Sequence, residues 1–173
     1  VGGDGTGQSW GRYRFVNNTV ITNDNAVFRI FDGIESIEMH NNVFYSDSDA
    51  VNMIRQVEAE WTGGTAVIGG ASNWVKTGAS NVPSQWTATR YASAPDFVDF
   101  AGLNLRPVAG SVQLVDQADT SPSSPAGHSF PSPLFPPLNH PPERIVSSDG
   151  STAPRPDNGS LDIGAFESDF VIA

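Results

Sequence analysis

The chain has 173 residues, which is long enough for one domain with a hydrophobic core. Its 9 basic and 19 acidic residues give a net charge of −10, and this excess of negative charge argues against binding to nucleic acids or to anionic membranes. The absence of cysteine excludes disulfides and thiol sites. No stretch approaches the roughly 18–20 apolar residues of a membrane span, so none is expected.

A short segment occurs twice near the start of the chain. Residues 15–21 (FVNNTVI) reappear as residues 39–45 (MHNNVFY), and the Asn pairs give a period of 41 − 17 = 24 residues. Self-similarity at such a period is typical of solenoids. Short β-branched and aromatic runs between Asn, Asp, Gly and Ser clusters favour strands over helices. The sequence therefore predicts a coil of parallel strands with about 24 residues per turn.

Residues 24 apart are expected to stack on neighbouring strands. The expected pairs are Phe15 with Met39, Val20 with Phe44, and Ile30 with Ile54. Asn18, Asn42 and Asn73 are expected to form a ladder whose side-chain amides bond to the turns above and below. The last step is 73 − 42 = 31 residues, so about seven residues are inserted, most plausibly within residues 56–64.

These repeats resemble the right-handed parallel β-helix proteins of the pectin-lyase-like superfamily. Residues 104–116 and 161–167 (LDIGAFE) resemble the closing segment of many bacterial secreted β-helix proteins. The chain departs from that pattern at Val112, where the family usually has proline, and by a long Pro/Ser insertion. The residues that match the motif are Asp116, Asp162 and Glu167, and we expect them to be structural carboxylates that accept hydrogen bonds from turn amides, with Arg155 as ion partner.

The predicted fold is all-β: a right-handed parallel β-helix (solenoid) of about 24 residues per turn with a Pro-rich carboxyl-terminal extension. Residues 1–116 would form the turns and a closing strand pair within residues 103–115. Residues 117–160 would form a surface extension, because proline lacks the donor that a central strand needs. Residues 161–173 would form the final strand and tail.

The repeats are fewer than a solenoid needs, so the chain reads as the carboxyl-terminal part of a longer protein. A second copy, or an upstream fragment, is expected to cover the open amino-terminal edge.

The resemblance implies two kinds of chemistry on the outer face of neighbouring strands. Hydrolases use paired carboxylates, and lyases use an Arg or Lys base together with calcium. Outward positions in this chain include Glu38 and His40, and the inserted loop holds the catalytic candidates Arg55, Glu58 and Glu60. Trp61, beside them, is a candidate for stacking on a sugar ring. The alternative is a solvated loop whose Trp packs against the body of the protein.

The acidic cluster near residue 47 is a candidate for calcium. Asp47 and Asp49 could supply oxygen ligands, although the cluster lacks the length and glycine of an EF-hand loop. Asp and Ser are also ordinary turn formers, which is the competing interpretation.

The sequence thus favours a secreted or cell-surface protein that binds or processes an acidic or neutral polysaccharide. If it is an enzyme, the resemblance implies a polysaccharide lyase or a glycoside hydrolase. The alternative is a non-catalytic surface, adhesive or structural protein. These expectations depend on analogy of fold and not on a recognisable catalytic set.

Overall fold

The computed structural model describes residues 11–23, 26–48, 50–130, 135–141 and 154–168. Within these residues the chain forms short strands and one short helix. In chain order the elements are β1 (Arg12–Val16), β2 (Thr19–Ile21), β3 (Ser36–His40), β4 (Val43–Tyr45), α1 (Ala59–Thr62), β5 (Ile68–Ala71), β6 (Trp74–Lys76), β7 (Arg90–Ala92), β8 (Phe97–Asp99) and β9 (Asn104–Pro107).

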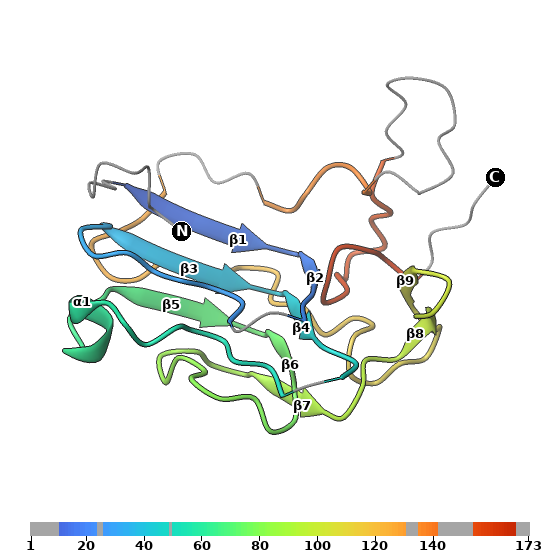
Figure 1. Cartoon of the computed structure of the whole chain (residues 1–173). Coiled ribbons are helices and arrows are strands. Elements are labelled where there is room, and N and C mark those ends of the chain that lie inside the picture. Colours follow the sequence, from blue (N-terminus) through green and yellow to red (C-terminus); the bar gives the residue numbers. More distant parts are fainter. Residues whose placement is uncertain (1–10, 24–25, 49, 131–134, 142–153, 169–173) are drawn as a thin grey trace, which may run out of the picture.

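The strands form three sheets (Figure 1). One parallel sheet contains β1, β3 and β5 in that order, and a second parallel sheet contains β2, β4, β6 and β7. Strand β8 pairs with β9 in an antiparallel sheet. The two parallel sheets are linked by short corners, because β1 leads directly into β2, β3 into β4 and β5 into β6.

The prediction of a right-handed parallel β-helix is wrong. A solenoid of equal turns needs a constant offset between paired strands, and here the offset changes at each step. It is 24 residues from β1 to β3 (36 − 12), 31 from β3 to β5 (68 − 37) and 16 from β6 to β7 (90 − 74). The strands therefore belong to separate sheets, and after β7 parallel pairing gives way to the antiparallel β8–β9 pair.

The predicted register holds in the first pairing and shifts after it. Phe15 lies opposite Met39, and Val20 lies opposite Phe44, as expected. Further along, Phe28 and not Ile30 lies opposite Ile54. Because side chains alternate along a strand, a shift of two residues keeps the apolar side chains on the core side.

The main hydrophobic core contains inward-facing residues of both parallel sheets. Fully buried members are Ile37, Met39, Phe44, Met53, Ile54 and Val75. Trp86 lies at one side of this core, where its ring stacks on Phe44 with 5.8 Å between centroids. A Cβ on Gly70 would lie 2.7 Å from the Trp86 ring, so this strand position requires glycine for the two to pack together.

The corners between the parallel sheets contain the predicted Asn ladder. Asn18 Nδ2 donates to Asn42 Oδ1 at 3.0 Å, and Asn42 Nδ2 donates to Asn73 Oδ1 at 2.9 Å. The residue before each ladder Asn has left-handed backbone geometry, with φ of 52° at Asn17, 58° at Asn41 and 52° at Ser72. Asn tolerates this conformation better than most residues, which explains the Asn pairs of the repeat.

Residues 119–130, which we call the crossing segment, pass over the outer face of the β1–β3–β5 sheet. Arg14 of β1 donates to the Pro122 carbonyl at 2.9 Å, Ser124 donates to Glu38 of β3 at 3.0 Å, and Pro125 lies against Gly69 of β5. The segment is irregular, as its prolines predicted.

Two predicted strands are absent from the carboxyl-terminal half. The strand pair expected within residues 103–115 is wrong, because β9 ends at Pro107 and its partner is β8. The described residues 154–168 contain no strand, so the final strand expected at residues 161–167 is also wrong. Residues 1–10 lie outside the described residues, and the expected cover of the β1 edge by a second copy or upstream fragment remains a prediction.

Candidate functional site

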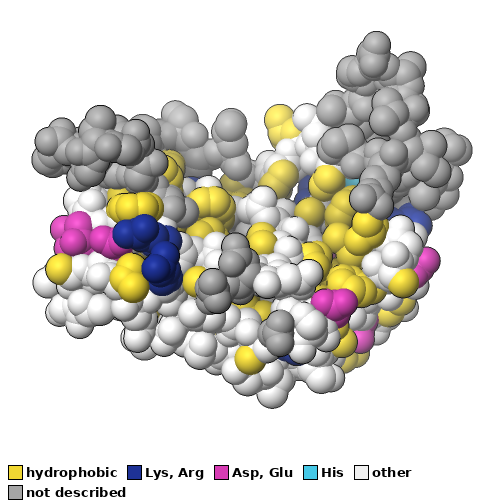
Figure 2. Space-filling model, viewed as in Figure 1, with side chains coloured by type: hydrophobic (Ala, Val, Ile, Leu, Met, Phe, Trp, Pro, Cys, Tyr) yellow, Lys and Arg dark blue, Asp and Glu magenta, His cyan; other side chains and the backbone are white. Residues whose placement is uncertain are grey.

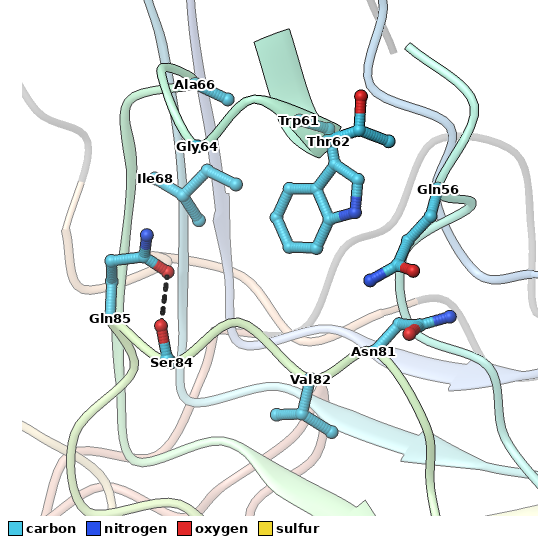
Figure 3. Close-up of a pocket in the computed structure, with 10 residues that line it drawn as sticks. All are labelled: Gln56, Trp61, Thr62, Gly64, Ala66, Ile68, Asn81, Val82, Ser84 and Gln85. Atoms are coloured by element: carbon cyan, nitrogen blue, oxygen red, sulfur yellow. Dashed lines mark hydrogen bonds between the residues drawn. The ribbon is translucent and has the colours of Figure 1, made fainter. Parts of the chain in front are cut away.

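A pocket of about 390 Å³ lies between α1 and the chain that follows β6 (Figure 3). Its volume is within the range of ordinary ligand pockets, about 300–1,000 Å³. The lining residues are Gln56, Trp61, Thr62, Gly64, Ala66, Ile68, Asn81, Val82, Ser84 and Gln85. They come from the inserted loop with α1, from the start of β5 and from the turn before Trp86.

Trp61 is the central side chain of this pocket. Figure 3 shows its indole projecting from α1 between Ile68 on one side and Gln56 on the other, with Val82 below. Trp61 is half-buried and also packs against the main core. Both interpretations of the sequence therefore apply to this residue, because one part of the ring packs on the body and another part lines the pocket.

The polar lining groups are all uncharged. Gln56, Asn81 and Gln85 contribute carboxamides, and Thr62 and Ser84 contribute hydroxyls. Each of these groups both donates and accepts hydrogen bonds. The pocket thus combines an aromatic face with neutral, two-way hydrogen-bonding groups, and none of its ten lining residues is charged.

The predicted catalytic candidates of the inserted loop do not converge on the pocket. Glu58 forms an ion pair with Arg29 at 2.5 Å, and Glu60 accepts a hydrogen bond from the Gly33 amide at 3.1 Å. Arg55 is exposed. None of Arg55, Glu58 and Glu60 is among the lining residues. Figure 2 shows acidic and basic side chains side by side at the end of the molecule where α1 lies, in keeping with such pairing.

The calcium candidates are placed only in part. Asp47 is exposed, and Asp49 lies outside the described residues. The neighbouring Ser46 is buried, and its carbonyl accepts a hydrogen bond from Lys76 Nζ at 2.7 Å. Over the residues that the structure describes, no group of three or more His, Asp and Glu side chains is placed to hold a metal ion.

A second polar cluster lies beneath the crossing segment. Glu38 is fully buried, and its carboxylate lies 2.7 Å from Arg14 Nε and 3.3 Å from His40 Nε2. Ser124 of the crossing segment donates to the same carboxylate. Burial lowers the pKa of His40 despite the nearby Glu38, because the charged imidazolium loses more from desolvation than it gains from the carboxylate. Glu38 and His40 point outward as expected, but the crossing segment covers them.

A third polar cluster ties down the carboxyl-terminal motif. Asp162 accepts hydrogen bonds from the amides of Asp116 and Ser168, at 2.8 and 2.6 Å. Glu167 accepts one from Arg155 Nε at 2.6 Å, and both of these side chains are buried. Asp116 takes part through its backbone and is itself exposed, with φ of 56°. The cluster is thus built from turn amides and an Arg–Glu pair, as structural sites are.

No protein-family model, curated protein or solved structure matches this chain. Function must therefore be argued from the residues of the pocket and of the two polar clusters.

Within the part of the chain that the structure describes, no helix has the length and apolar character needed to cross a bilayer.

Sequence reasoning found Trp61 but missed the amide residues around it. Asn81 and Gln85 lie some twenty residues after Trp61, in a stretch where the sequence allowed either short strands or an irregular flap. Amide side chains are common in turns, so their type alone gave no signal. Their role becomes visible only when β5 and β6 bring that turn beside α1.

Proposed function

We propose that this protein binds a neutral polysaccharide through the Trp61 pocket, without turning it over. The observation that carries the proposal is the lining itself: one half-buried Trp surrounded by three carboxamides and two hydroxyls. Polysaccharides are met outside the cell, so the proposal goes together with a secreted or cell-surface location.

The lining suits a sugar ring on both of its chemical sides. A pyranose has an apolar face of C–H groups, and a flat indole offers a large apolar surface to it at little cost in conformational entropy. The sugar hydroxyls both donate and accept hydrogen bonds, as the carboxamides and hydroxyls of the pocket do. Gln56 and Gln85 are exposed and so are accessible to a ligand.

Charge favours a neutral sugar over a uronate. The ten lining residues provide no Arg or Lys for a sugar carboxylate. The nearby Arg29 is paired with Glu58. The chain as a whole has a charge of −10, which repels polyanions at low ionic strength.

Binding without turnover follows from the same lining. Glycoside hydrolysis requires two carboxyl groups placed about 5–10 Å apart across the scissile bond. The pocket lining supplies none, and the nearest acidic side chains, Glu58 and Glu60, are bonded to the turn at Arg29 and Gly33.

The proposal is tested by titrating the protein with xylan, galactomannan, amylose and polygalacturonate, and by assaying reducing ends and unsaturated uronates. We expect one of the neutral polymers to bind, no release of products, and no binding of polygalacturonate. Trp61→Ala should weaken the binding about 30-fold, as expected for loss of an aromatic contact worth about 2 kcal/mol. Tyr91→Ala is the matched control, because Tyr91 is also an aromatic side chain, 53% exposed and outside the pocket.

Three results would contradict the proposal: tighter binding of polygalacturonate than of any neutral polymer, product release, or equal affinity of the Trp61→Ala and wild-type proteins.

A further inference from the structure

Helix α1 is too short to hold Trp61 in place by itself. It spans only the four residues Ala59–Thr62, and isolated helices of this length are not stable in water. None of its residues is fully buried. The residue before it, Glu58, makes no side-chain hydrogen bond to the first turn, so the helix lacks the usual local cap.

The missing cap comes from a different turn of the chain. Asp32 lies between β2 and β3, and its carboxylate accepts hydrogen bonds from the amides of Ala59 at 3.2 Å and Glu60 at 2.9 Å. Both carboxylate oxygens are used. These amides are among the donors that a helix leaves without intrahelical partners, and a carboxylate there also interacts favourably with the helix dipole.

Two further contacts join the same turn to the same helix. Arg29 pairs with Glu58, and the Gly33 amide donates to Glu60. Arg29 and Gly33 are exposed, so these contacts alone are expected to be weak. The Asp32 bonds differ because they are charge-assisted and they satisfy backbone donors.

We propose that Asp32 is a positioning residue for the pocket: it caps α1 from outside the helix and so fixes the indole of Trp61 in the orientation that meets the ligand. Trp61 directly follows Glu60, whose amide Asp32 holds. Loss of the cap lets α1 fray, and the protein must then order Trp61 when the ligand binds. This ordering costs affinity without removing any ligand contact. The inference rests on the function proposed above.

The first test needs no ligand. In Asp32→Ala the fluorescence of Trp61 should move to longer wavelength, because a frayed α1 exposes the indole to water. The same shift should be absent when Asp32→Ala is made in a Trp61→Phe background. Asp157→Ala is the matched control, since Asp157 is also an exposed turn residue whose carboxylate accepts a backbone hydrogen bond, from Gly159 at 3.1 Å. A fluorescence shift that persists in the Trp61→Phe background, or no shift at all, would overturn the proposal.

The second test uses the neutral polymer that the wild-type protein binds. Asp32→Ala should weaken its binding about tenfold, the size expected for loss of a helix cap, and Asp32→Asn, which keeps one acceptor oxygen, should lie between it and the wild type. The double variant Asp32→Ala/Trp61→Ala should bind no more weakly than Trp61→Ala alone, because Asp32 acts through that ring. Additive losses, or wild-type affinity of Asp32→Ala, would overturn the proposal.

The two proposals fail in distinguishable ways. If Trp61→Ala leaves binding unchanged, the proposed function is wrong, while the fluorescence test of Asp32 still stands. If Trp61→Ala weakens binding and Asp32→Ala does not, only the role of Asp32 is wrong. Should Asp32→Ala fail to fold, Asp32→Asn carries both readouts.

Discussion

Asn42 is bonded on both sides of its side chain, to the turn above and to the turn below. Its Oδ1 accepts from the amide and from Nδ2 of Asn18, at 2.9 and 3.0 Å. Its Nδ2 donates to Phe15 O at 3.0 Å and to Asn73 Oδ1 at 2.9 Å. The residue is fully buried, so water cannot replace a lost partner. It is therefore the ladder position whose loss should cost most.

We predict that Asn42→Ala lowers the free energy of unfolding by about 3 kcal/mol, because it leaves buried groups unsatisfied at about 1–3 kcal/mol each. Asn23→Ala is the control, since Asn23 is exposed and surface substitutions usually stay within about 0.5 kcal/mol. Urea unfolding of the two variants measures both values. Equal shifts of the midpoint would show that the ladder contributes nothing special.

Glu167 gives a pH dependence of known sign. Burial raises the pKa of this carboxyl from 4.5 to about 7, and Arg155 only partly opposes the shift. A raised native pKa contributes stability that is fully present below about pH 4.5 and is lost as the pH rises through about 7. We predict that the wild type loses stability over this window relative to Glu167→Gln, which resembles the protonated acid.

Urea unfolding of both proteins at a series of pH values between 4 and 8 tests this prediction. A wild type that gains stability over the variant as the pH rises would show that the Arg155 pair keeps the carboxylate charged.

At the scale of elements, the crossing segment depends on one buried carboxylate of β3. Glu38 pairs with Arg14 and accepts from Ser124, so it joins β1, β3 and the crossing segment. Removing one partner of a buried ion pair typically costs about 3–5 kcal/mol, because the remaining charge is left buried.

We therefore predict that Glu38→Gln destabilises the protein by about 3 kcal/mol and speeds amide hydrogen exchange in residues 119–130. The chain offers a closely matched control in Glu35→Gln. Glu35 also pairs with an Arg of β1, Arg12 at 2.7 Å, but it is exposed, so its loss should cost about 1 kcal/mol or less. Similar exchange rates in the two variants would contradict the assigned role of Glu38.

The elements that the sequence predicted are those whose cause is local. The corners at Asn17 and Asn41 were visible, because the left-handed geometry and the ladder require particular residue types at fixed spacing. Helix α1 was not visible, because its cap comes from Asp32 in another turn. The pairing of β8 with β9 was also missed, since a hairpin between short strands competes with many alternative pairings.

At the scale of the whole molecule, the 24-residue period was extended too far. It describes β1 with β3 and β2 with β4, and the insertion carrying α1 then changes the offset to 31 residues. The same insertion forms one wall of the pocket, and residues 81–85 form the other. The pocket could not be predicted because it exists only where the regular repeat fails.

The most direct test of the central claim is a nitrogen–proton NMR titration of the protein with oligosaccharides of the neutral polymer that binds. We predict shifts of the Trp61 indole N–H and of the side-chain amides of Gln56, Asn81 and Gln85. The indole N–H of Trp74, which is buried and donates to Gln113 at 2.7 Å, should stay in place. Binding that leaves the Trp61 signal unmoved, or no shift with any neutral sugar, would contradict the account.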